Sequence, residues 1–246
     1  MAGHSKWANI QHRKGRQDAA RSKRFAKLAR EVTVAAKLGD PDPDKNPRLR
    51  LAVREAKANS VPKDVIERAI SKAVGPDADQ LIEMRYEGYG PSGVAVIVET
   101  MTDNKNRTAS TVRAIFSRCG GNLAETGAVS FLFDRCGEIT FSPDAIDSEK
   151  LFDVAVDAGA DDIESFDDAH IVYTAEKELA SVTASLESEI GEPVSARMIW
   201  RPKTVSQLNE DDASKVLRLL EMLDDEDDVQ VVTSNIEFPE TMITAQ

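Results

Sequence analysis

Apolar residues in the first third of the chain recur at the three- and four-residue spacing of amphipathic helices. Phe25, Leu28 and Val32 begin one such stripe, and two more follow. The pair Asn46-Pro47 is typical of a helix start, because an Asn side chain caps free backbone N–H groups and proline suits the first helical position. The pattern therefore predicts a small three-helix bundle. The three helices are expected from Asp18 to Gly39, from Asn46 to Asn59 and from Pro62 to Gly75.

Beyond residue 84 the pattern changes to the alternation and short apolar runs of strands. VAVIVE is a buried run, and the GPSG before it suits a turn between two strands. The pattern gives two strands, then a helix, then two strands across a TG turn. These elements are predicted at 86–89, 94–99, 107–118, 123–125 and 129–133.

The stretch 137–203 has the complete order strand, helix, strand, strand, helix, strand, which is the ferredoxin-like arrangement. Residues 213–238 then supply one helix and one strand, the two elements that the preceding α/β stretch lacks. We therefore predict an α+β protein with an N-terminal three-helix domain and two ferredoxin-like βαββαβ-type domains, the third inserted into the second. The predicted domains are 1–78, 79–136 plus 204–240, and 137–203.

Charge divides the chain as sharply as the apolar pattern does. The formal net charge is −12, yet residues 1–75 hold 18 Lys or Arg against 8 Asp or Glu. The first thirty residues alone hold nine Lys or Arg and a single acid, Asp18. A basic segment on an acidic protein indicates an anionic partner, and phosphate backbones are the commonest one because each neutralised phosphate releases counterions.

The candidate site is therefore a nucleic-acid-binding surface on the N-terminal arm and the first helix. Lys and Arg would contact phosphates, the two histidines would hydrogen-bond backbone or bases, and Trp7 would stack on an unpaired base. The competing interpretation is a solvated basic face with Trp7 packed on the bundle. The candidate residues are His4, Lys6, Trp7, His12, Arg13, Lys14, Arg16, Arg21, Lys23, Arg24 and Lys27.

Other charged features have simpler structural interpretations. Lys63, Arg68 and Lys72 of the third helix alternate with acids and are expected to pair within that helix. The segment 102–106 is expected to cap the following helix, with a second phosphate contact through Lys105 and Arg107 as the alternative. The acidic runs, among them DDEDD at 224–228, lack the spacing of a calcium loop and are expected to be solvated faces. Such faces would repel phosphate and confine nucleic acid to the N-terminal domain.

Neither catalysis nor a cofactor is expected. Cys119 has no evident His partner, His170 lies in a predicted hairpin turn, and no phosphate-cradling glycine motif is present. Two cysteines are too few for a disulfide framework, and no metal site is predicted. No apolar run has the length of a membrane helix and no secretory signal is evident, so a cytoplasmic location is the expectation.

Several motifs together resemble the YebC family, also called YebC/PmpR. They are the opening MAGHSKWANIQHRKGRQDA, then YEGYGPSGVA, DNKNRT and RCGGNL, in the family's order across nearly the whole chain. Gln11 stands where the family more often has a basic residue, and Ser92 where a second Gly is common. The resemblance implies a helical domain followed by two α/β domains.

Members of that family are described as DNA-binding transcription regulators, and some as ribosome-associated translation factors or mitochondrial translational activators. The resemblance thus implies a transcription regulator that binds DNA, with a translation factor that binds ribosomal RNA or tRNA as the alternative. The sequence shows no helix pair with the short Gly-containing turn of a helix-turn-helix, which argues against operator reading. A protein–protein adaptor, with the acidic domains as contact surface, is the alternative of another class.

Overall fold

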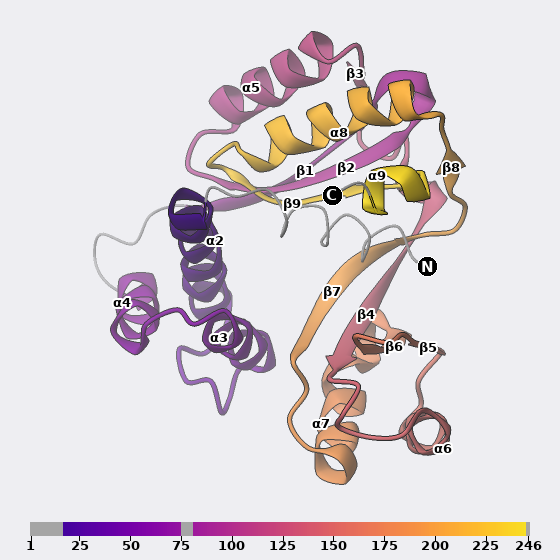
Figure 1. Ribbon diagram of the computed structural model, residues 1–246. Coiled ribbons are helices and arrows are strands. Elements are labelled where there is room, and N and C mark those ends of the chain that lie inside the picture. Colours follow the sequence, from indigo (N-terminus) through magenta and orange to yellow (C-terminus); the bar gives the residue numbers. More distant parts are fainter. Residues whose placement is uncertain (1–16, 75–80, 245–246) are drawn as a thin grey trace. The chain divides into compact units, whose positions relative to one another are not determined.

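The computed structural model describes residues 17–74 and 81–244 and has the expected α+β fold. The described residues form two compact units (Figure 1). One comprises 17–23, 81–134 and 201–244, and the other comprises 24–74 and 135–200. The helices are α2 (Gln17–Leu38), α3 (Pro47–Ala58), α4 (Lys63–Val74), α5 (Lys105–Arg118), α6 (Ser148–Ala158), α7 (Leu179–Ile190), α8 (Glu210–Asp224) and α9 (Glu240–Thr244). The strands are β1 (Ile82–Tyr89), β2 (Ala95–Thr102), β3 (Asn122–Leu123), β4 (Phe133–Phe141), β5 (Asp162–Ser165), β6 (His170–Ala175), β7 (Ser195–Pro202), β8 (Ser206–Gln207), β9 (Val229–Ser234) and β10 (Ile236–Glu237).

The helices α2, α3 and α4 form the predicted small bundle around Val, Leu, Ile and Ala side chains. Asn46 fixes the turn between α2 and α3: its Oδ1 accepts from Leu49 N at 3.1 Å, and its Nδ2 donates to Ala35 O and Asp40 O at 2.8 Å. Gly39 ends α2 because this amide lies against it, so that a Cβ atom there would come within 2.6 Å of Asn46 Nδ2. One buried polar side chain thus caps one helix and ties it to another.

The first sheet has the strand order β3-β1-β2-β9, with β1 and β2 a hairpin. Helices α5 and α8 cover one face of it (Figure 1), and their apolar residues share a core with Val96 and Val98 of β2. Both α8 and β9 follow the second α/β stretch in sequence, yet they complete this first sheet. The predicted insertion of one α/β domain into the other is therefore confirmed.

The hairpin turn between β1 and β2 is a single 3-10 turn at Pro91–Gly93. Ser92 has φ of 57°, the left-handed region that costs a residue with a Cβ atom about 1–2 kcal/mol. The sequence motif that resembles the YebC family implied a Gly at this position, and the positive φ shows that the departure to Ser bears on the backbone. The Ser92 side chain hydrogen-bonds the Asp212 carboxylate, which contributes to lowering the pKa of Asp212.

The second sheet has the order β5-β6-β4-β7, in which each strand with a resolved register is antiparallel to its neighbour. With α6 and α7 between the strands, the chain order is βαββαβ, as predicted for a ferredoxin-like domain. Its core combines Ile139 and Phe141 of β4 with Leu151 of α6 and Leu186 of α7.

The strand predicted at 129–133 is wrong. Residues 130–132 form a 3-10 turn instead, and only Phe133 begins a strand. The reason lies 42 residues upstream, where the carboxylate of Glu87 accepts hydrogen bonds from Val129 N and Ser130 N at 2.9 Å. A side chain therefore satisfies the backbone donors that a strand would have offered to a neighbour.

Candidate nucleic-acid interface

Only some of the predicted binding residues lie in the part of the chain that the structure describes. Arg21, Lys23, Arg24 and Lys27 lie in the first half of α2. The remaining predicted residues lie outside the described residues, and their role stays a prediction. These are His4, Lys6, Trp7, His12, Arg13, Lys14 and Arg16.

On α2 the basic residues recur at helical spacing. Arg21, Arg24 and Lys27 follow one another at intervals of three and so lie along one side of the helix. Arg21, Lys23 and Arg24 are exposed and Lys27 is half-buried. Lys23 Nζ lies 2.9 Å from Asp225 Oδ1, an exposed ion pair of the kind that contributes about 1 kcal/mol or less. The helix therefore presents a solvent-accessible row of cations.

Helix α4 does not present a comparable row. Lys63 pairs with Glu67 at 3.6 Å and Arg68 with Asp64 at 2.5 Å, each one helical turn away. The expected pairing within this helix is confirmed for Lys63 and Arg68. Carboxylates in the first turns of α4 would repel phosphate, so this face is poorly suited to nucleic acid.

The connection from α3 to α4 is short and contains no glycine. It spans only residues 59–62, and Ser60 takes the left-handed conformation with φ of 60° that a glycine would normally adopt. The connection thus has the length of a helix-turn-helix turn, with a serine in the left-handed position. Asp64 and Glu67 at the start of α4 nevertheless leave no cationic end to enter a groove.

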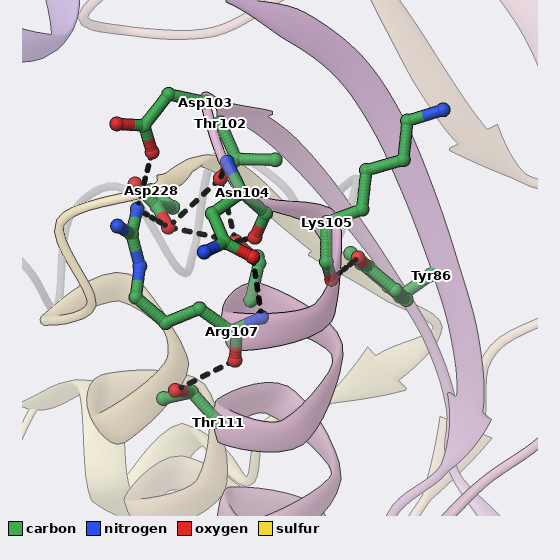
Figure 2. A network of polar contacts seen from close by, with 9 residues as sticks. Tyr86, Thr102, Asp103, Asn104, Lys105, Arg107, Thr111 and Asp228 are labelled. Atoms are coloured by element: carbon green, nitrogen blue, oxygen red, sulfur yellow. Dashed lines mark hydrogen bonds and ion pairs between the residues drawn. The ribbon is translucent and has the colours of Figure 1, made fainter.

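The start of α5 is fixed by a network of polar contacts around Asp228 (Figure 2). Its Oδ2 accepts from Thr108 Oγ1 and Arg107 Nη2 at 2.7 Å and from Thr102 Oγ1 at 3.2 Å. Asn104 caps the helix by accepting from Arg107 N at 3.1 Å, as predicted for this segment. The network joins the end of β2, the start of α5 and the residue before β9.

Arg107 is committed to this network, because it also contacts Asp103 Oδ1 at 2.8 Å. A guanidinium between two carboxylates is a poor phosphate ligand, since both acids would repel the incoming anion. Lys105 and Arg107 were the two residues considered for a second phosphate contact in this segment. Among the described residues, Arg107 is in ion pairs and the Lys105 ammonium group is in none.

Asp228 also corrects the expectation that the whole acidic run 224–228 is a solvated face. Its side chain is 9% exposed, whereas Asp225 in the same run is 76% exposed. Burial by itself would raise the pKa of the Asp228 carboxyl, but the hydrogen bonds from Arg107, Thr108 and Thr102 hold that pKa below its ordinary value of 3.8. The available sequence signal is position, since Asp228 directly precedes the apolar strand VQVV.

Comparison with known families accounts for nearly all of the chain. A sequence model described as the TACO1/YebC protein N-terminal domain matches residues 5–76. A second model, named Transcrip_reg and described as the TACO1/YebC second and third domain, matches residues 81–236. The chain belongs to the TACO1/YebC family. The resemblance seen in the sequence motifs is confirmed.

A solved structure of the same size supports the family's fold. The crystal structure of a conserved hypothetical protein from Aquifex aeolicus is 44% identical in sequence and superposes with a TM-score of 0.84. The match covers 94% of this chain and 96% of that one. The name of the second family model points to a regulatory role in transcription and names no enzymatic activity.

In this TACO1/YebC chain a second buried carboxylate, Glu87 of β1, was not singled out in the sequence. Its side chain is fully buried, accepts from backbone N–H groups, among them those of Val129 and Ser130 at 2.9 Å, and lies 3.0 Å from Arg85 Nε. Burial would raise its pKa, but the N–H groups of residues 127, 129 and 130 together with Arg85 hold the pKa below the ordinary 4.5. These contacts are internal, which makes Glu87 a structural residue.

The residues considered for catalysis also have structural surroundings. Both ring nitrogens of His170 have partners, Ser165 Oγ at 2.8 Å and Ile146 O at 3.0 Å. Burial raises the pKa of the Cys119 thiol, against the opposing effect of Arg218 and Arg118, so the thiolate that nucleophilic chemistry needs is disfavoured. In the part of the chain that the structure describes, no cluster of three His, Cys, Asp or Glu could hold a metal, and no helix is long and apolar enough to cross a membrane.

Proposed function

We propose that this protein is a nucleic-acid-binding regulator of transcription that binds the sugar–phosphate backbone through its basic N-terminal segment. The observation that carries the proposal is charge: nine Lys or Arg and one acid in the first thirty residues of a chain with net charge −12. On the described part of that segment, Arg21, Lys23 and Arg24 are exposed on α2. Membership of a family whose model is named for transcription regulation supports the same function.

The proposed mechanism is binding and positioning without bond chemistry. Arg side chains can hold two phosphate oxygens through the guanidinium fork, whereas Lys acts as a point charge. Each contact releases counterions, so the affinity falls steeply with salt but carries little sequence information by itself. The α/β domains would then serve as a shaped body that presents a surface to further partners.

A second candidate function is a translation factor that binds the ribosome. It is favoured by α4, whose first turns carry Asp64 and Glu67 where a DNA-reading helix would place groups that reach base edges. Without such a reading helix, binding depends on backbone and shape, which is how structured RNA is commonly recognised.

Co-sedimentation with ribosomes decides between the two candidates. Purified protein is pelleted with ribosomes at moderate salt, with and without excess duplex DNA, beside a variant that lacks residues 2–16. Transcription regulation predicts that duplex DNA removes the protein from the pellet. Retention despite the DNA, lost in the deletion variant, would instead support the ribosomal function. Absence of binding to either polyanion would refute the proposal as a whole.

A further inference from the structure

Helix α5 is a basic element within the acidic part of the chain. Its sequence, KNRTASTVRAIFSR, contains four Lys or Arg and no Asp or Glu. Residues 76–246 as a whole hold 13 Lys or Arg against 35 Asp or Glu. A helix without a single acid is therefore an exception in this region, and its cations are not there to balance acids on the same helix.

The cations of α5 differ in what they contact. Arg107 is held by Asp103 and Asp228 and belongs to the buried network. Lys105, Arg113 and Arg118 are exposed, and among the described residues none of the three takes part in an ion pair or a side-chain hydrogen bond. Three of the four charges thus face solvent without a protein partner in that part of the chain.

One cation of the neighbouring helix α8, which otherwise carries Lys215 and five acids, extends this surface. Helix α8 lies beside α5 on the same face of the first sheet (Figure 1). Arg218 of α8 is exposed and, like Arg118, lies close enough to Cys119 to oppose the rise that burial causes in the pKa of that thiol. Cys119, which follows α5, also contacts α8 directly, because its Sγ lies 3.6 Å from the Sδ of Met222, one helical turn beyond Arg218. We call Lys105, Arg113, Arg118 and Arg218 the α5–α8 basic face. At 3.6 residues per turn, Arg113 and Arg118 lie about 140° apart, on the two flanks of the exposed side of α5.

The uncharged residues on the outer side of α5 are small or polar. Asn106, Ser110, Ala114 and Ser117 are exposed, and none is aromatic. Amide and hydroxyl groups can donate to phosphate oxygens, whereas proteins that hold single strands rely on aromatic side chains for base stacking. From Lys105 to Arg118 the helix rises about 20 Å, a length over which one duplex strand presents several phosphates.

We propose that the α5–α8 basic face is a second binding surface for double-stranded nucleic acid, which contacts its phosphodiester backbone. This inference rests on the proposed function and adds a contact surface to it. It also replaces the expectation that the acidic domains confine nucleic acid to the N-terminal domain, because a local basic face governs contacts within a Debye length of about 8–10 Å whatever the net charge of the rest.

The test compares two double variants that each remove two exposed positive charges. R113Q/R118Q alters the α5–α8 basic face, and K150Q/K177Q, at exposed positions of the other compact unit, is the matched control. The affinity of the full chain for a 20-base-pair DNA duplex and for the same sequence as duplex RNA is measured across a salt series. Thermal unfolding of each variant confirms that the fold is retained.

Loss of two phosphate contacts lowers the slope of log K against log salt by about 2, so the fall in affinity between about 50 and 200 mM salt shrinks roughly tenfold. This result is expected for R113Q/R118Q and not for the control. If the slope falls for only one duplex, that nucleic acid, DNA or RNA, is the ligand of the second surface. If the slope falls equally for both, the surface recognises the phosphodiester backbone alone.

A variant that lacks residues 2–16 separates the two proposals. If that deletion weakens binding while R113Q/R118Q behaves like the control, the second surface is refuted and the proposed function stands. If the unaltered chain binds neither duplex, both proposals fail.

Discussion

At the scale of single residues, the buried carboxylates Asp228 and Glu87 show what charge patterns conceal. Asp228 closes an acidic run, yet it is buried and holds Arg107, Thr108 and Thr102 together. Glu87 sits in a strand and holds the backbone of a distant turn. Neither role has a local sequence signal beyond the strand that follows Asp228, because the partners lie as many as 126 residues away.

Replacement of Asp228 by Asn is expected to lower the free energy of unfolding by about 2–3 kcal/mol. The amide keeps the shape but loses the charge that attracts Arg107, and it places an N–H₂ donor against groups that donate. Asp103→Asn is the matched control, since its side chain is 61% exposed and its helical pair is worth about 0.5 kcal/mol or less. Urea unfolding at neutral pH measures both changes. Equal losses in the two variants would contradict the role given to Asp228.

The pH dependence of stability follows from the same carboxylates. The pKa values of Asp228 and Glu87 are lowered by folding, so both groups contribute stability at pH values above their ordinary 3.8 and 4.5. That contribution is lost as pH falls through the lowered pKa values of the folded protein. The difference in unfolding free energy between wild type and Asp228→Asn should therefore shrink between about pH 5 and pH 2. A difference that stays constant over this range would show that the Asp228 pKa is not lowered.

At the scale of elements, the starts of α3 and α5 were predicted correctly and one predicted strand was wrong. Asn46 and Asn104 cap α3 and α5 as the sequence indicated, because capping involves neighbours within a few residues. The insertion was predictable because a helix and a strand were missing from one α/β stretch. The prediction of a strand at 129–133 was wrong. The apolar residues there have the spacing of a strand, but the backbone N–H groups of Val129 and Ser130 donate to the Glu87 carboxylate instead of to a neighbouring strand.

The helix caps differ in burial, so we expect their substitution to lower the free energy of unfolding by different amounts. Asn46 is buried and makes three hydrogen bonds, so Asn46→Ala is expected to cost about 2–3 kcal/mol of unfolding free energy. Asn209 is exposed and caps α8 by accepting from Asp212 N at 2.9 Å, so Asn209→Ala should cost about 1 kcal/mol. Guanidinium unfolding of the two variants gives the ranking, and the reverse order would contradict the bridging role of Asn46.

At the scale of the whole molecule, the separation of charge along the chain is the dominant feature. Residues 1–75 hold 18 Lys or Arg and 8 Asp or Glu, while the remainder is strongly acidic apart from α5. The sequence identified the basic segment, and the structure adds that its described part is a helix with exposed cations. Of the α5–α8 basic face, the sequence suggested only Lys105 as a phosphate contact, because the complete face needs the pairing of two helices that the inserted domain separates in sequence.

The central claim is that the basic N-terminal segment binds phosphate backbones, and salt dependence tests it most directly. The affinity of the full chain for duplex DNA and duplex RNA is measured from about 50 to 300 mM salt, beside the variant R13Q/K14Q/R21Q/R24Q. The account predicts a steep slope of log K against log salt for the unaltered chain and a slope smaller by about 3–4 for the variant, one unit for each lost phosphate contact. Binding that is insensitive to salt, or a slope that the four substitutions leave unchanged, would contradict the account and favour a protein partner for this segment.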